Sequence, residues 1–256
     1  MTARGFAKFQ QARSAILART EPLRRLARGE AGMAAVEFAL ILPMMLALYF
    51  GCVVLAQGLE VGRKTQALSR TLADLTAQTP AIGAAPPVLA DADILNIFAA
   101  SSAVLFPFSG AANMTISEVV FDNVSSGNSQ CCVAKILWSV GSGPAPVLRQ
   151  CATLAQSSNG VNAPGSMPIG VYPPAVANNS NGPDIYIIVA DVTYSYSPGF
   201  GFETGHWNQS PNNGAGYKIS QTTYMSPRNG ANTAIQWTPG GAIPSTQYVT
   251  CTPNTP

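Results

Sequence analysis

The longest apolar stretch of the chain lies near its N-terminus. Nineteen residues from Phe38 to Ala56 carry no charge, which matches the ~20 residues that a helix needs to cross a hydrocarbon core. A secretory signal peptide has a shorter apolar core that is followed by a small-residue cleavage site, and a buried helix of a soluble domain is seldom this long. The pattern therefore predicts one transmembrane helix, which we place at about residues 38–58.

Helical spacing of apolar residues continues beyond this stretch. The positions that keep it are Leu55, Leu59, Val61, Leu68, Leu72 and Leu75. They predict a single helix that runs to about Ala77, either as an ordinary stalk or as a helix that packs on a globular head. Thr79 and Pro80 would end this helix, and the Ala/Pro-rich residues up to Ala90 are typical of a linker.

A short amphipathic helix is expected after Asp91, which we interpret as its cap. Its apolar face would consist of Ile94, Leu95, Ile97 and Phe98. Alternating, β-branched and aromatic residues then predict strands at 114–121, 133–140, 147–154, 184–196, 217–225, 233–237 and 247–251.

The second and third of these strands would form a hairpin through the turn at 141–144, and residues 155–183 would form a long exposed loop. The expected fold class is α+β, with a long N-terminal transmembrane helix followed by a small antiparallel β-sheet head and a short packed helix. The expected organisation is a basic cytoplasmic leader (1–32), the transmembrane helix with its extension (33–79), a linker (80–90) and a periplasmic α+β domain (91–256).

Charge is scarce and unevenly distributed. Charged residues make up 10% of the chain, against roughly 25% in a soluble globular domain, which favours a membrane or exported protein. Seven basic residues and one acid lie at or before Arg28, whereas four basic and seven acidic residues lie from Pro80 onward. The positive charge before the helix predicts a single-pass protein of the bacterial inner membrane with a cytoplasmic N-terminus and a periplasmic remainder. The adjoining apolar run argues against a nucleic-acid partner for the basic tail.

One acidic residue stands at the edge of the apolar run. Glu37 lies in the stretch GEAGMAAVEFALILP, and a carboxylate at a membrane edge is a functional candidate; the alternative is an interfacial Glu that reaches the headgroups. The stretch resembles the processing site of type IV prepilins, in which a peptidase cuts after the Gly that ends a basic leader and Glu is the fifth mature residue. Cleavage between Gly32 and Met33 would make Glu37 the fifth residue and Phe38 the sixth.

The wider string is similar to TadE-like and TadG-like proteins, the pseudopilin-type accessory proteins of tight-adherence (Flp) pilus systems. That family commonly reads Ala-Val-Glu-Phe-Ala before a leucine-rich run with an early proline, here Pro43, which favours a kink in the helix. Segments 189–200 and 224–228 resemble the family within the head. No von Willebrand-type adhesion domain is evident in the sequence, which favours the TadE-like class.

The resemblance implies a minor pilin-like role with other pilins or pseudopilins, the pilus assembly machinery and a prepilin peptidase as partners. Glu37 would pair with the α-amine of Met33 on a neighbouring subunit, which offsets part of the cost of burying both charges. The pair would set the axial register of assembly.

Five cysteines are present, one of them inside the apolar run. The other four, Cys131, Cys132, Cys151 and Cys251, fall in the exported part, where an even number indicates two disulfides. Four cysteines allow three pairings, and a bridge between neighbours would be strained. We favour the pairs Cys132–Cys151, across the expected hairpin, and Cys131–Cys251.

No catalytic or metal-binding motif is apparent. The single histidine, His206, lies in a Gly-rich segment, no serine stands in Gly-x-Ser-x-Gly, and no Cys-x-x-Cys spacing exists. We therefore expect neither an enzyme nor a cofactor. The alternatives to a pilin-like role are a permanently anchored periplasmic binding or scaffold module and, remotely, a hydrolase that uses His206.

Overall fold

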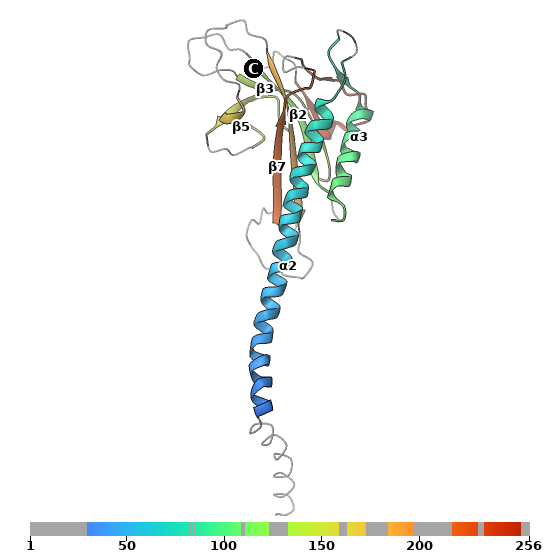
Figure 1. Ribbon diagram of the computed structural model, residues 1–256. Coiled ribbons are helices and arrows are strands. Elements are labelled where there is room, and N and C mark those ends of the chain that lie inside the picture. Colours follow the sequence, from blue (N-terminus) through green and yellow to red (C-terminus); the bar gives the residue numbers. More distant parts are fainter. Residues whose placement is uncertain are drawn as a thin grey trace, which may run out of the picture. The chain divides into compact units, whose positions relative to one another are not determined.

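The computed structural model describes residues 30–81, 83, 85–108, 111–122, 133–158, 163–172, 184–196, 217–229 and 233–251. The chain divides into two compact units, Met1–Ala56 and Gln57–Pro256. The helix α2 spans Glu30–Ala77, so its residues up to Ala56 belong to the first unit and the rest to the second. The sequence predicted the end of this helix at Ala77, which is confirmed (Figure 1).

The described part of the second unit combines the end of α2 and the helix α3 with a mixed sheet, so the α+β class is confirmed (Figure 1). After α2 the elements are β1 (Val88–Leu89), α3 (Asp91–Ser102), η1 (Ala103–Leu105), β2 (Asn113–Asp122), β3 (Val133–Ser142), β4 (Thr153–Ser157), β5 (Ser166–Pro168), η2 (Ile169–Val171), β6 (Ile185–Tyr196), β7 (Tyr217–Met225), β8 (Gln236–Trp237), η3 (Ser245–Gln247) and β9 (Tyr248–Thr250).

The sequence predicted an antiparallel sheet, and this is wrong because the sheet is mixed. Seven strands join in the order β5-β4-β3-β2-β6-β7, with β9 also paired to β3. β4 and β5 are parallel, as are β1 and β8 in a separate two-stranded sheet. The sequence does not predict the short strand β5, because it lies in residues 155–183, where Asn, Gly, Ser and Pro indicate a loop. Its central residue, Met167, is fully buried and packs in the core.

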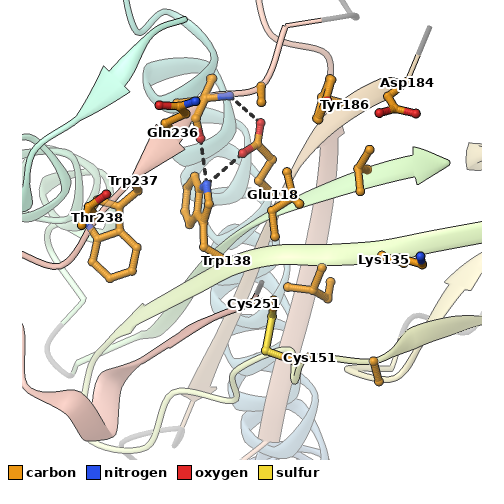
Figure 2. Close-up of a pocket in the computed structure, with 16 residues that line it drawn as sticks. Glu118, Lys135, Trp138, Cys151, Asp184, Tyr186, Gln236, Trp237, Thr238 and Cys251 are labelled. Carbon is orange, nitrogen blue, oxygen red and sulfur yellow. Dashed lines mark hydrogen bonds between the residues drawn. A yellow bond between two sulfur atoms is a disulfide. The ribbon is translucent and has the colours of Figure 1, made fainter. Parts of the chain in front are cut away.

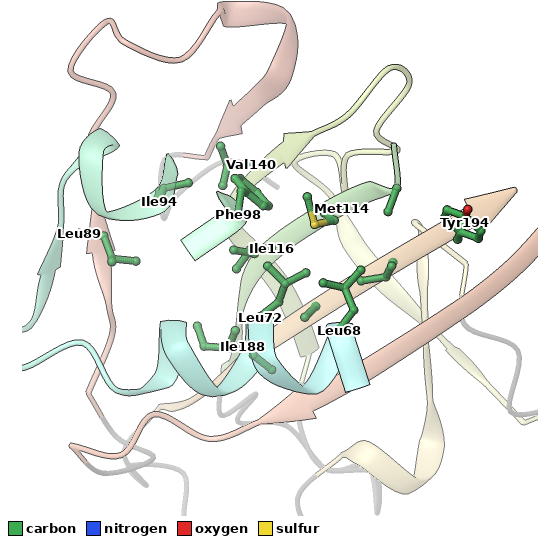
Figure 3. Close-up of a cluster of buried hydrophobic side chains, with 14 of the residues drawn as sticks. Leu68, Leu72, Leu89, Ile94, Phe98, Met114, Ile116, Val140, Ile188 and Tyr194 are labelled. Atoms are coloured by element: carbon green, nitrogen blue, oxygen red, sulfur yellow. The ribbon is translucent and has the colours of Figure 1, made fainter. Parts of the chain in front are cut away.

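The second half of α2 is part of the core of the second unit. Its buried side chains recur at helical spacing along one face: Val61, Thr65, Leu68, Ser69, Leu72, Ala73, Thr76 and Ala77. Figure 3 shows Leu68 and Leu72 pointing at Ile116 of β2 and Ile188 of β6, with Phe98 of α3 beside them. An apolar stripe of this width on one face is what drives a helix onto a sheet. Of the two alternatives that the sequence left open, an ordinary stalk or a helix that packs on the head, the structure shows the second.

The C-terminal end of α2 is held by a loop that follows β7. The last carbonyls of a helix lack partners within it; here the backbone N–H of Arg228 donates to the Ala77 carbonyl at 2.9 Å, and the Asn229 amide donates to the Thr79 carbonyl. The Arg228 guanidinium also pairs with Asp74. The Pro-Arg segment that resembled the family thus secures the end of the helix.

The opposite face of the sheet carries a second, smaller core. Its buried members are Val119, Phe121, Ala134, Ile136, Leu154, Met167, Ile187 and Val189. A shift of register between Glu118 and Val119 on β2, where β3 has one extra residue, lets Val119 and Ile136 face this side together. A bulge of this kind inserts a residue into one strand and re-aims its neighbours.

Asp91 does not cap α3, contrary to the sequence interpretation. The N-cap is Ala90, whose backbone N–H donates to the Asp93 carboxylate at 3.1 Å. Asp91 itself accepts hydrogen bonds from the Trp237 indole at 3.0 Å and from the backbone N–H groups of Gly240 and Ala242, both at 2.9 Å. These bonds, the Gly240 bond first, lower the pKa of Asp91 despite its burial. A residue at a helix start thus fastens the C-terminal loop.

The expected hairpin between 133–140 and 147–154 forms only at its far end. β4 pairs with β3 at two positions, Ala134 with Leu154 and Lys135 with Thr153. The other half of β3, Trp138–Val140, pairs with β9 instead. The C-terminal strand therefore occupies the place that the sequence assigned to residues 147–151.

Candidate functional site

The processing-type segment lies within the first turns of α2. Gly32 is helical, and Met33, Glu37 and Phe38 are helical and exposed. Met33 and Glu37 are four residues apart, so both lie on the same face of the helix. Glu37 is therefore a carboxylate on an exposed helical surface that is otherwise apolar.

That surface extends over most of residues 33–56. Its large apolar side chains are exposed: Met33, Val36, Phe38, Leu40, Ile41, Leu42, Met44, Met45, Leu46, Leu48, Tyr49, Phe50 and Leu55. By length and composition the helix can cross a membrane, which is consistent with a single-pass anchor. Pro43 lies inside the helix, as the sequence indicated. Its missing N–H removes one backbone bond of the helix.

A buried carboxylate of the second unit was missed by the sequence interpretation. Glu118 on β2 is fully buried. One of its oxygens accepts from the Trp138 indole N–H at 2.8 Å, and the other accepts from the backbone N–H of Ile235 at 2.6 Å. Figure 2 shows both bonds, together with the bond from Trp138 to the Ile235 carbonyl, which is 2.8 Å long. Glu118 thereby joins β2, β3 and the segment that leads into β8.

Burial raises the pKa of Glu118 to about 8, and the hydrogen bonds from Ile235 and Trp138 oppose the rise. Removing a carboxylate from water disfavours its charged form. Between its ordinary value of 4.5 and about 8, the folded protein therefore holds a proton that the unfolded chain has released. Stability is greatest below this window and falls as the pH rises through it.

The expected result is a pH-dependent free energy of unfolding that Glu118→Gln makes flatter. From pH 5 to 8 the parent protein should lose stability by on the order of 1 kcal/mol per pH unit, because in this range the folded state keeps a proton that the unfolded chain has released. Urea unfolding of the full chain in detergent micelles, followed by tryptophan fluorescence, measures this slope. An equal slope in Glu118→Gln would contradict the role of Glu118.

A pocket of about 420 Å³ opens beside this cluster. Glu118, Trp138 and Trp237 lie at one part of its wall, and Lys135 and Asp184 at another (Figure 2). Apolar and aromatic side chains line it together with a few charged groups, a composition that small-molecule sites share. Among the described residues, no group of three or more His, Cys, Asp or Glu gathers as a metal site would require.

The opposite face of the sheet holds a buried ion pair. The guanidinium of Arg149 is almost fully buried and binds both carboxylate oxygens of Asp191, at 2.8 and 3.1 Å. It also donates to the carbonyls of Ala163 and Ser166, both at 3.2 Å, and the Thr222 hydroxyl donates to Asp191 at 2.6 Å. One arginine therefore fastens β5 and the segment before it to β6.

The favoured disulfide pairs are wrong. Cys151 is bonded to Cys251, with the Cα atoms 5.4 Å apart. The cause is the position of β9: the Cys251 N–H donates to the Leu137 carbonyl of β3, so Cys251 lies opposite Cys151. Cys131 and Cys132 lie outside the described residues, as does His206.

Comparison with known families agrees with the position of the helix. Residues 32–74 match the family model described as TadE-like protein, which confirms the resemblance to that family over most of α2. No curated protein and no solved structure matches the chain.

Proposed function

We propose that this chain, whose long helix carries the TadE-like segment, is a minor pilin-like component of a tight-adherence pilus assembly system. It is anchored in the inner membrane by about residues 38–58, with the N-terminus in the cytoplasm and the head in the periplasm. It acts by non-covalent assembly of subunits and not by catalysis.

One observation carries the proposal. A single helix, Glu30–Ala77, is apolar and exposed around Glu37 and becomes a core element of an α+β unit beyond Gln57. An apolar helical surface of this length needs either lipid or other helices around it. The match over residues 32–74 supports pilus-associated helices as those partners. Glu37 then supplies the charge that an incoming amine requires.

The position of the mature N-terminus tests the proposal. The intact mass and N-terminal sequence of the protein are measured in membranes with and without the prepilin peptidase. We expect a chain that begins at Met33 and appears only with the peptidase. A chain that begins at Met1 in both membranes would contradict processing and remove the amine that Glu37 is proposed to bind.

The pocket beside Glu118 favours one alternative, a permanently anchored binding or scaffold module. Its mixed aromatic and charged lining could hold a small ligand or a peptide side chain. The two functions differ in what Trp237→Ala should do. In a binding module this substitution removes the partner and leaves fibres intact, whereas in a pilin-like component it affects fibres only as far as it destabilises the head.

A further inference from the structure

We propose that the end of the second unit at which α2 enters it rests on an anionic membrane surface, with Phe106 and Tyr217 as apolar contacts and Arg63, Lys64 and Lys218 as cationic contacts. The inference rests on one part of the proposed function, the membrane anchoring of α2. It does not require incorporation in a fibre.

Three chain segments meet at this end. The second unit begins at Gln57, directly after the uncharged run. The Tyr196 hydroxyl donates to the Gln57 side chain at 3.0 Å, so the last residue of β6 lies level with the start of the unit. Tyr217, the first residue of β7, pairs with Tyr196 in the sheet and therefore lies there too.

The segment that follows α3 also lies at this end of the unit. The Lys64 ammonium donates to the Phe106 carbonyl and lies 5.6 Å from the centre of the Phe108 ring. Lys64 is seven residues after Gln57, which is about 10 Å along the helix. Because helical side chains tilt toward the N-terminus, the Lys64 ammonium and the Phe106 carbonyl that it binds lie less than this distance from the start of the unit.

The exposed side chains at this end have the chemistry of a membrane interface. Phe106 is 81% exposed, more than any other large apolar side chain among the described residues, and Tyr217 is 48% exposed. Among the described residues at this end, Arg63 and Lys218 are exposed and Lys64 is partly so, and Glu60 is the one exposed acid. Aromatic rings concentrate at the headgroup level of bilayers, and lysine and arginine there attract anionic lipids. A partner of this composition is an anionic phospholipid surface.

Tryptophan quenching by brominated lipids tests the contact in the full chain reconstituted in anionic bilayers. Phe106→Trp keeps the backbone carbonyl that Lys64 binds, so the segment should stay in place. Val88→Trp is the matched control: Val88 is 60% exposed and pairs with Gln236. Ile235, the residue before Gln236, donates its backbone N–H to Glu118. Glu118 pairs with Ile188 of β6, and Ile188 lies about 25 Å along that strand from Tyr196.

We expect the tryptophan at position 106 to be quenched more than the parent protein and the tryptophan at position 88 to be quenched no more than the parent. Quenching at 106 should weaken in zwitterionic bilayers. It should weaken too in a Phe106→Trp/Lys218→Gln variant, in which the contact equilibrium shifts about fivefold.

Leu48→Trp separates the failure of this inference from the failure of anchoring. Leu48 lies within the uncharged run, so its tryptophan must be quenched if α2 spans the bilayer. No quenching at 48 would contradict the anchoring itself. Quenching at 48 but not at 106 would overturn the surface contact alone, as would emission at 106 that responds to the protein-to-lipid ratio, which indicates a second copy there. Equal quenching at 106 in both lipids would overturn the anionic assignment.

Discussion

Glu37→Ala is expected to abolish the incorporation of the protein into fibres while leaving its amount in the membrane unchanged. In the proposed assembly the Glu37 carboxylate pairs with the amine of a neighbouring Met33 in surroundings from which water is excluded. Removing one partner of such a pair leaves the other charge buried and alone, which costs about 3 kcal/mol or more. That loss weakens association more than about a hundredfold per contact. Electron microscopy of surface fibres and immunoblots of membranes measure the two quantities.

Glu60→Ala is the matched control for this experiment. Glu60 is an exposed glutamate of the same helix, so its loss removes the same charge without touching the proposed pair. Fibres should form normally in Glu60→Ala and should be lost in Glu37→Gln, which keeps the size of the side chain but not its charge. Normal fibres in Glu37→Ala at normal protein levels would refute the pairing role and favour an interfacial Glu37.

Arg149→Ala is expected to lower the free energy of unfolding by about 3 kcal/mol. The substitution leaves the Asp191 carboxylate without its bidentate partner and the carbonyls of Ala163 and Ser166 without their donor. It also opens a cavity where a fully buried side chain stood. Urea unfolding of the full chain in detergent micelles, followed by near-ultraviolet circular dichroism, gives the change.

Two further variants serve as controls for Arg149→Ala. Lys218→Ala removes an exposed cation from the same sheet and should change stability by less than about 0.5 kcal/mol. Arg149→Met fills part of the volume without the charge and should lose less than Arg149→Ala if cavity formation contributes. A loss below about 1 kcal/mol in Arg149→Ala would mean that the ion pair does not hold β5 to the sheet.

The helix and the long strands could be predicted from the sequence because each has a strong local pattern. α2 has an uncharged run followed by a stripe of apolar residues, and its end at Ala77 follows from Thr79 and Pro80. The alternation of Ile185–Tyr196 likewise indicates β6 without knowledge of its neighbours. Hydrophobic periodicity is a pattern among residues that are close in sequence, so it can be read from a single sequence.

The pairing of distant segments could not be predicted in the same way. Residues 147–151 follow a turn and contain apolar side chains, so a hairpin with β3 was the local choice, yet β9 takes that place. The disulfide error followed from this, since the partner of Cys151 depends on which strand lies beside β3. β5, with three residues and one buried side chain, is too short for any period to show.

The buried acid left a signal that could have been used. Met114, Ile116 and Glu118 alternate along β2, and the first two are apolar. A period of two therefore places Glu118 on the core face of the strand. A carboxylate in such a position requires donors, and the nearby indole of Trp138 would have been a candidate. Its second donor, the backbone of Ile235, lies more than a hundred residues away in sequence and has no local trace.

The position of β9 also has a consequence for the timing of export. Three early elements depend on contacts with residues near the C-terminus. The end of α2 binds Arg228, the start of α3 binds Gly240 and Ala242, and the edge of β3 pairs with Tyr248–Thr250. In the proposed orientation the N-terminus stays in the cytoplasm and the chain crosses from α2 onward, so each of these contacts forms only after the residues that complete it have crossed. During an export in this order the apolar face of α2 would stay uncovered until the strands that pack on it have followed. A factor that shields exported chains would act on this protein for as long as its C-terminus remains inside.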